Sequence, residues 1–325
     1  MPVGLVHLNI AAGTGSSPTL SVLSFPLLND ASITGQSAGI ISSITSNSIT
    51  NSGAGWTAGA LSTAASPYII QITSGSATGR SFLISTSTAN TATTVTVDAQ
   101  ESTQVNLTTL GIATGTSGDT YSIYECDTLL SIFGAGSAMA SGTAVLGATS
   151  SDAADSVQLF VSGAWRQYYY NTATGNWKRV GPDTVSDNVP IRPDTGIIYS
   201  RLPASALNLA ITGHVPSVDR QAIVANSGVT FVSSAWPTDS TLGSSNIASI
   251  SGWVASSSSS GADMVQMLIS GAWRQYYYDG TNWRRVGPDT VSDSVAVPMG
   301  TAAILQKSGT AAGVTTLVQT IPYAL

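Results

Sequence analysis

The sequence has little charge of either sign, a single cysteine and only two histidines. Charged residues make up 9% of the 325 residues, and 11 Lys and Arg stand against 17 Asp and Glu. With a net charge of −6, the chain lacks the basic surface that nucleic acids and anionic membranes attract. We therefore expect no nucleic-acid partner. No run of about 20 apolar residues predicts a membrane span.

This scarcity leaves little material for catalysis or metal binding. Cys126 has no cysteine partner within the chain, and we interpret it as a small buried apolar residue. His7 and His214 lie in apolar, strand-like runs, which favours a structural role for both. No clustered metal-ligand pattern occurs, so we predict no enzyme, no catalytic residue, no metal and no cofactor. An enzyme would need a cleft of convergent carboxylates, which the sequence does not reveal.

What the sequence does contain is a long repeated segment. Residues 157–187 and 265–293 are nearly identical, but the second copy is two residues shorter just after its Tyr-Tyr-Tyr run. Loop tips tolerate such deletions, and the Asp-Gly found there in the second copy favours a tight hairpin turn. Each copy is therefore predicted to form a three-stranded antiparallel meander, in the first copy over residues 157–161, 164–170 and 177–180.

The repeat extends beyond this core and divides the chain. An offset of 106 residues aligns 196–201 with 302–307, and an offset of 211 aligns 19–26 with 230–237. We therefore predict a first module over residues 1–206 and a second module over residues 207–325. The first module carries an insertion at about 35–126 with four strand-like runs, at residues 67–72, 81–84, 93–97 and 120–124.

The predicted fold class is all-β, with two tandem antiparallel modules that resemble β-sandwiches or barrels. The modules share the three-stranded meander, and the first holds the inserted β-rich segment. The only helix expected is short, over residues 127–133, with Asp127 as N-cap and Gly134 as its end. Residues 75–80 contain glycines like a phosphate loop, but their spacing and the flanking strands favour a hairpin turn.

Two acidic residues are repeated with the segment. Asp183 and Asp187 in the first copy correspond to Asp289 and Asp293 in the second. Their carboxylates are the oxygen ligands that calcium prefers. Turn formation is the simpler explanation, because Asp accepts local backbone hydrogen bonds.

The repeated aromatic residues are the best candidates for a binding surface. Strand alternation places Tyr168 and Tyr170 on one face and Tyr169 on the other. Exposed, such a face would suit a polysaccharide or a protein partner, whereas buried it would form the core of each module. The candidate face comprises Trp165, Tyr168, Tyr170, Trp177, Trp273, Tyr276, Tyr278 and Trp283.

The two ends of the chain are almost uncharged and rich in Val, Leu and Ile. Uncharged edge strands template association, since natural edges are usually blunted by charge. These ends must pair either within the subunit or with a second copy of the chain. The candidate inter-subunit strands are marked by Val3, Leu5, Val6, Leu8, Leu317, Val318 and Ile321.

Several turn and strand segments also carry a resemblance to known proteins. They are the start Pro-Val-Gly-Leu-Val, residues 70–75, 79–84, 118–124 and 127–129, and the Tyr-Tyr-Tyr hairpin. Over most of its first 215 residues the chain resembles an uncharacterised paralogous family of exported β-rich proteins of verrucomicrobial bacteria. The resemblance implies export and transfers no activity or catalytic residue. This chain departs from the family in lacking the expected signal peptide and in repeating the hairpin.

Composition, duplication and uncharged ends together favour a structural role. We expect an extracellular or cell-surface protein, its signal peptide removed, that assembles with itself into a filament or surface array through β-strand contacts. Contacts that do not close on themselves produce filaments. The alternative is a carbohydrate-binding or adhesion module that uses the Trp and Tyr faces. Loss of glycan binding in Trp165→Ala or Trp273→Ala would favour that alternative.

Overall fold

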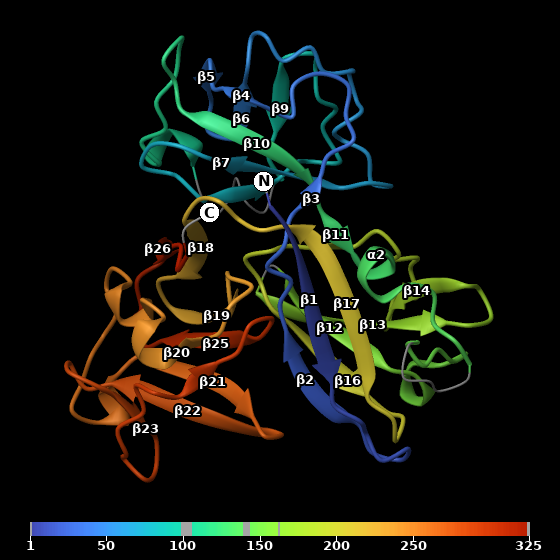
Figure 1. Cartoon of the computed structure of the whole chain (residues 1–325), viewed down its shortest axis with the longest axis vertical. Coiled ribbons are helices and arrows are strands. Elements are labelled where there is room, and N and C mark those ends of the chain that lie inside the picture. The colour runs from blue at the N-terminus through green and yellow to red at the C-terminus, as the bar shows by residue number, and fades with distance from the viewer. Residues whose placement is uncertain (1, 99–105, 139–143, 162, 324–325) are drawn as a thin grey trace.

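The computed structural model describes residues 2–98, 106–138, 144–161 and 163–323. The chain forms antiparallel β-sheets, which confirms the all-β prediction (Figure 1). The α-helix α2 (Leu129–Phe133) lies where a short helix is expected. Its cap is Thr128, one residue later than predicted, because the Thr128 and Ser131 hydroxyls form a reciprocal capping box. Asp127 instead begins the two-residue strand β11 (Asp127–Thr128).

The first copy of the repeated segment forms part of a five-stranded sheet. The predicted meander is confirmed, and its hairpin tip lies between the paired residues Asn171 and Asn176. The sheet is open, with a strand at each edge that has one neighbour, so it is a sandwich layer and not a barrel. In spatial order its strands are β14 (Asn176–Arg179), β13 (Ala164–Asn171), β12 (Ser156–Val161), β16 (Ile197–Arg201) and β2 (Thr19–Leu23).

The second copy forms a sheet with the same strand order. Its meander pairs Tyr278 with Trp283, as Tyr170 pairs with Trp177 in the first copy. The strands that flank the two meanders are those aligned by the offsets of the sequence repeat. In the corresponding order they are β23 (Trp283–Arg285), β22 (Ala272–Tyr278), β21 (Met264–Ile269), β25 (Ala302–Lys307) and β19 (Gly228–Ser233).

A two-stranded ribbon accompanies each five-stranded sheet and completes a sandwich. In the first sandwich β1 (Val3–Ile10) pairs with β17 (Leu207–His214). In the second, β18 (Arg220–Ala225) pairs with β26 (Val314–Gln319). Inward residues of the first ribbon share one hydrophobic core with the first sheet, and those of the second ribbon share another with the second sheet. Burial of these apolar faces holds the layers together.

Strand β17, which the predicted division assigns to the second module, pairs with β1 of the first. Residues 207–214 pair along their whole length with β1 and therefore belong to the first sandwich. The boundary predicted at residue 206 falls immediately before this strand. The sequence repeat does not reveal the partner, because β1 and β17 lie far apart in the chain.

The inserted segment has a hydrophobic core of its own, which includes Trp56, Ile70 and Phe82. The four strands expected there are confirmed, with small shifts at their ends. Its larger sheet contains β3 (Asn29–Asp30), β4 (Ala38–Ile40), β7 (Tyr68–Ile72), β8 (Ser81–Leu83) and β10 (Thr120–Glu125). Its smaller sheet contains β5 (Ser43–Ile44), β6 (Ser48–Thr50) and β9 (Thr94–Thr96), and the turn η1 (Leu107–Thr109) follows.

Short elements are also repeated between the two sandwiches. In the first, β11 pairs with β15 (Pro190–Ile191) and leads into α2. In the second, β20 (Ser240–Thr241) pairs with β24 (Ala296–Val297) and leads into the 3-10 turn η3 (Leu242–Ser244). Thr241 and Ser244 form a capping box like that of Thr128 and Ser131. The remaining 3-10 turns are η2 (Ser151–Ala153), η4 (Ile247–Ser249) and η5 (Ser259–Gly261).

Each sandwich also buries a carboxylate that ties loops to its sheet. Asp155 accepts from the Leu146 and Leu202 amides, from the Tyr199 hydroxyl and from Arg201 Nη1 at 2.5 Å. In the second sandwich the corresponding carboxylate, Asp263, accepts from the Val254 and Ser308 amides. Satisfying buried polar groups in this way fixes the loops, because unpaired groups there would be costly.

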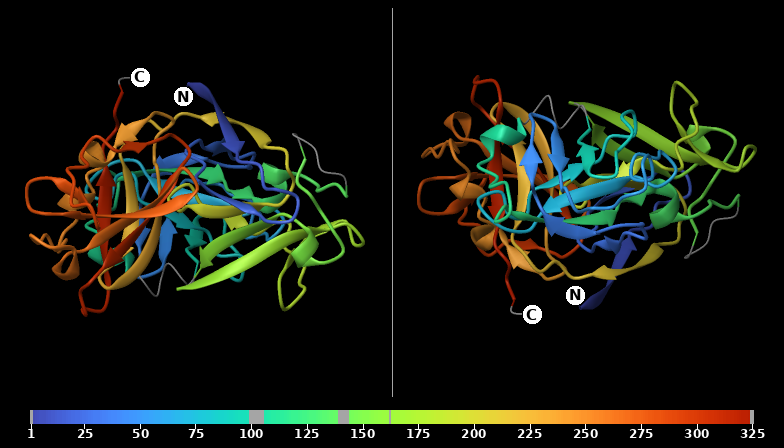
Figure 2. Two further views of the ribbon diagram at one scale, coloured as in Figure 1. Left: turned by 90° about the horizontal axis from the view of Figure 1, so that it is seen from below. Right: turned by 90° about the horizontal axis from the view of Figure 1, so that it is seen from above.

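The three parts of the chain meet at shared contacts. Val22 and Ile198 of the first sandwich pack with Phe231 and Ala302 of the second through the outer faces of the two large sheets. The inserted segment reaches the second sandwich through Arg80, whose Nη1 donates to Thr316 Oγ1 at 2.7 Å. Both chain ends project from the same side of the molecule (Figure 2).

Candidate functional site

The eight candidate aromatic residues do not form one exposed face. Six of them line the cores of the sandwiches: Tyr168, Tyr170, Trp177, Tyr276 and Trp283 are buried, and Tyr278 is half-buried against the second core. Strand alternation explains this, because Tyr168 and Tyr170 point to the face that the ribbon covers. These six repeated aromatic residues therefore form part of the hydrophobic cores and do not form an exposed binding face.

Trp165 and Trp273 are the two exceptions, with exposed fractions of 41% and 38%. They occupy equivalent positions in β13 and β22, on the face opposite to the core. Trp165 packs its ring at 5.1 Å from that of Phe160 and at 5.5 Å from that of Phe231, at the contact between the sandwiches. A carbohydrate-binding face made of the repeated aromatics would therefore depend on these two indoles alone.

The terminal strands β1 and β26 both pair within the subunit, and within the residues that the structure describes β1 has a neighbouring strand on one side only. Val6 and Leu8 in β1 and Leu317 in β26 are buried in the cores, while Ile321 donates its amide to Asp219 Oδ1. Val3 and Leu5, by contrast, have exposed fractions of 71% and 56%. The first ribbon contains only β1 and β17 among the described residues, so the other edge of β1 has no strand beside it.

Register identifies the backbone groups on this open edge. The Val215 amide donates to the Pro2 carbonyl at 2.9 Å, in line with the β1–β17 register. Hydrogen-bonded pairs alternate along an antiparallel ladder, so even-numbered residues of β1 bond to β17. The backbone groups of Val3, Leu5 and His7 therefore point away from β17. On β26 the Asn226 amide donates to the Gly313 carbonyl, so the odd-numbered residues of β26 bond to β18. The backbone groups of Val314, Thr316 and Val318 therefore point away from β18.

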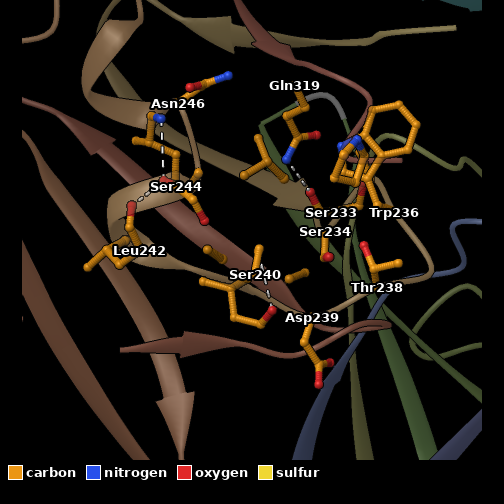
Figure 3. Close-up of a pocket in the computed structure, with 18 of the residues that line it drawn as sticks. Ser233, Ser234, Trp236, Thr238, Asp239, Ser240, Leu242, Ser244, Asn246 and Gln319 are labelled. Atoms are coloured by element: carbon orange, nitrogen blue, oxygen red, sulfur yellow. Dashed lines mark hydrogen bonds between the residues drawn. The ribbon is translucent and has the colours of Figure 1, made fainter. Parts of the chain in front are cut away.

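A pocket of about 200 Å³ opens in the second sandwich (Figure 3). Its floor is apolar and includes Leu242, Ile247 and Met267. Hydroxyl groups from the turns beside β19 and β20 line its sides, and Asp239, Asn246 and Gln319 add a carboxylate and two amides. Sequence reasoning did not find this site. The one available signal is the alignment of Trp236-Pro237 with Phe25-Pro26, which marks Trp236 as the end of a repeated strand.

The repeated aspartates serve local turns. The amide of Trp177 donates to Asp187 Oδ1 at 2.7 Å, and the amide of Trp283 donates to Asp293 Oδ1 at 3.0 Å. Asp183 forms an ion pair with Lys178 at 3.1 Å. These contacts support the turn interpretation over calcium binding. Across the described ranges, no group of three or more His, Cys, Asp or Glu side chains is arranged to hold a metal ion.

Cys126, residues 75–80 and His214, the other residues singled out in the sequence, make structural contacts. Cys126 is buried, burial raises the pKa of its thiol well above the usual value, and its Sγ lies 3.5 Å from the Ile191 carbonyl oxygen. Residues 75–80 form the predicted turn between β7 and β8, where the amide of Ile72 donates to the Arg80 carbonyl. His214 Nε2 lies 2.7 Å from Asp30 Oδ2, next to the exposed end of the first ribbon.

Comparison of the chain with protein-family models, curated proteins and solved structures finds no match. None of the helices in the described part combines the length and apolar character that a membrane crossing requires. The site must therefore be interpreted from its own geometry, which offers an open strand edge on the first sandwich and a polar pocket in the second.

Proposed function

We propose that this protein is an extracellular structural subunit that assembles with further copies of itself through β-strand addition. The observation that carries this proposal is the open edge of β1. Eight residues long, this strand has no charged residue other than the titratable His7. Long, exposed apolar edges that lack charge are templates for another strand.

The partner we propose for this edge is β26 of a neighbouring copy. The outward positions of β26, Val314, Thr316 and Val318, are uncharged, and the Val318 side chain is exposed. The Val318 carbonyl accepts only a long contact, 3.5 Å from Asn246 Nδ2, which a neighbouring strand would replace. Pairing β1 of one copy with β26 of the next joins two different surfaces. A contact of this kind repeats without closing and builds a filament or an array. Pairing of β1 with β1 would instead close into a two-fold dimer.

Composition agrees with a location outside the cell. Only 9% of residues are charged, and Ser, Thr and Gly are abundant, as in proteins of fibres and surface layers. The resemblance to a family of exported β-rich proteins points the same way. The proposal includes no catalytic step and no cofactor. The alternative function is a carbohydrate-binding module that binds a polysaccharide through the exposed Trp165 and Trp273.

The test compares two lysine substitutions on one ribbon. Leu5→Lys places a charge on the open edge, and Ala210→Lys places the same charge on the exposed face of the paired strand β17. Both positions are exposed, so both variants should keep the thermal stability of the parent. We expect the parent and Ala210→Lys to form polymers in negative-stain electron microscopy and concentration-dependent species in sedimentation, and Leu5→Lys to stay monomeric.

A second variant tests the ladder itself. Leu5→Pro removes an amide that points away from β17, so the internal pairing keeps its hydrogen bonds while the outward donor is lost. Assembly should fall as it does in Leu5→Lys. Monomers alone from the parent at every concentration, or assembly that survives both Leu5 variants, would contradict the proposal. Discrete dimers would contradict the filament and favour β1–β1 pairing.

A further inference from the structure

We infer that the pocket of the second sandwich is a binding site for one neutral sugar or similar small polyol. This inference does not rest on self-assembly, although β26, the strand proposed to meet β1 of a neighbouring copy, contributes Gln319 to the pocket. Its volume of about 200 Å³ is below the range of roughly 300–1,000 Å³ typical of sites for drug-sized ligands. A single ring with its hydroxyl groups is the scale of molecule that fits.

The charge of the lining selects against anionic ligands. Among the residues that line the pocket, Asp239 is the sole charged side chain, and no Lys or Arg is present. Phosphate, sulfate and carboxylate ligands would therefore lack a counter-charge. Asp239 Oδ1 accepts from the Met299 amide at 2.9 Å, which fixes the carboxylate at the rim. A carboxylate held in this way accepts hydrogen bonds from neutral hydroxyl groups, and side-chain amides both accept from them and donate to them.

Two side-chain amides are held only by long contacts and are ready to exchange them. Gln319 Nε2 lies 3.4 Å from the Ser233 carbonyl oxygen, and Asn246 Nδ2 lies 3.4 Å from Thr320 Oγ1. Such distances are at the weak end for hydrogen bonds. Figure 3 shows Gln319 and Asn246 on different segments of the chain, with Trp236 near Gln319. Trp236 supplies an aromatic wall of the type that packs against the carbon face of a sugar ring.

The pocket lies beside a turn where the second sandwich has small polar residues in place of two apolar residues of the first. Alignment on the two capping boxes places Ser245 and Asn246 where the first sandwich has Ile132 and Phe133. Phe133 fills the first sandwich, with its ring 5.3 Å from that of Tyr199 and 6.1 Å from that of Phe25. In the second sandwich Trp253 packs on Trp283 instead, with ring centroids 5.9 Å apart, and Ser245 and Asn246 line the pocket with hydrogen-bonding groups.

The experiment titrates the full chain with a panel of neutral monosaccharides, with inorganic phosphate and spermidine as charged probes. Saturation-transfer NMR detects weak binding, and calorimetry gives the dissociation constant. We expect saturable binding of at least one neutral sugar and none of either charged probe. The inference would be overturned if phosphate or spermidine bound saturably and no sugar did. It would also be overturned if no sugar in the panel showed saturable binding.

Three pocket variants and one control variant locate the site. Asn246 has a positive φ of 58°, so Asn246→Gly removes its amide without backbone strain. Asn246→Gly and Gln319→Ala should each weaken sugar binding about tenfold, the effect of losing a well-formed polar contact. Gln221→Ala removes an amide that lies outside the pocket and should leave binding unchanged. Ser245→Ile fills the pocket with the first-sandwich residue and should abolish binding while thermal unfolding shows an intact fold. Binding unaffected by all pocket variants would overturn the assignment.

Discussion

The two sandwiches share a strand order, a capping box and a buried carboxylate, yet they differ in what fills the space beside the capped turn. In the first, α2 runs on to Phe133, which contacts Phe25, Trp177 and Tyr199. In the second, η3 ends at Ser244, Trp253 packs on Trp283, and a pocket opens beside the capped turn. The comparison shows that the hydrogen-bonded frame tolerates large changes in packing, and that such changes can convert a core into a pocket.

The buried ion pair of the first sandwich is also shorter than that of the second. Arg201 Nη1 lies 2.5 Å from Asp155 Oδ2, and both side chains are fully buried. Lys307 Nζ lies 3.9 Å from Asp263 Oδ2 and donates to the Gly252 carbonyl at 2.8 Å. Arg201 also donates to the carbonyls of Ala144 and Ser205. The planar guanidinium thus joins several loops of the first sandwich, whereas the ammonium of the second relies more on backbone carbonyls.

The largest expected effect follows from breaking these pairs. Arg201→Met leaves Asp155 buried without its cation and should cost about 3–5 kcal/mol of unfolding free energy. Lys307→Met, the matched change in the second sandwich, should cost about 1–3 kcal/mol, because its ion pair is longer. Denaturant unfolding of both variants measures the difference. Equal losses would show that the two networks are equivalent in energy.

A smaller effect is expected from hollowing the first sandwich to resemble the second. Phe133→Ala removes a buried ring with three aromatic neighbours and should cost about 3 kcal/mol, from lost burial and the cavity left behind. Leu130→Ala in the same helix is the control, since Leu130 is exposed and should change stability by less than about 1 kcal/mol. If Phe133→Ala were as mild as its control, packing around α2 would not distinguish the two sandwiches.

The smallest effect concerns pH and a residue that only the first sandwich has. Burial raises the pKa of Asp127 to about 6, although Asn29 and Ser131 donate hydrogen bonds that lower it. The repeated short strand of the second sandwich has Ser240 at this position. A carboxyl whose folded pKa lies above its ordinary 3.8 adds stability below pH 3.8 that is lost as pH rises through about 6.

The variant Asp127→Asn keeps an amide in place of the carboxyl and removes the titration. Relative to this variant, the parent should lose about 2–3 kcal/mol of unfolding free energy between pH 3.5 and pH 7. Denaturant unfolding at several pH values measures the difference. Identical pH profiles for parent and variant would show that Asp127 titrates normally in the folded protein.

The sequence predicts the local β structure well, because strand alternation and turn residues act over short distances. The two-residue deletion after Tyr170 places the hairpin tip, and the β-branched runs of the inserted segment place its four strands. The cap of α2 is less certain from sequence, since Asp127 and Thr128 are both good capping residues. Only the reciprocal partner Ser131 decides between them.

Long-range features are not accessible in this way. The uncharged ends indicate strands that must pair, but composition does not select β17 for β1 or β18 for β26. The burial of Arg80 at the contact between the inserted segment and the second sandwich has no local signal either. The pocket is harder still to predict, because no sequence motif marks it. It depends on the small side chains of residues such as Ser245 and Asn246.

The pairing of β1 with β17 also has a consequence for synthesis. Ile10 pairs with Leu207, so nearly 200 residues must be made before the first strand meets its partner. At about 5–20 residues per second, β1 emerges from the ribosome roughly 10–40 s before the ribbon can close. The inserted segment, with its separate core, lies wholly within that interval and can fold first. Chaperone contact with the waiting Val3 and Leu5 would then protect the nascent chain until β17 arrives.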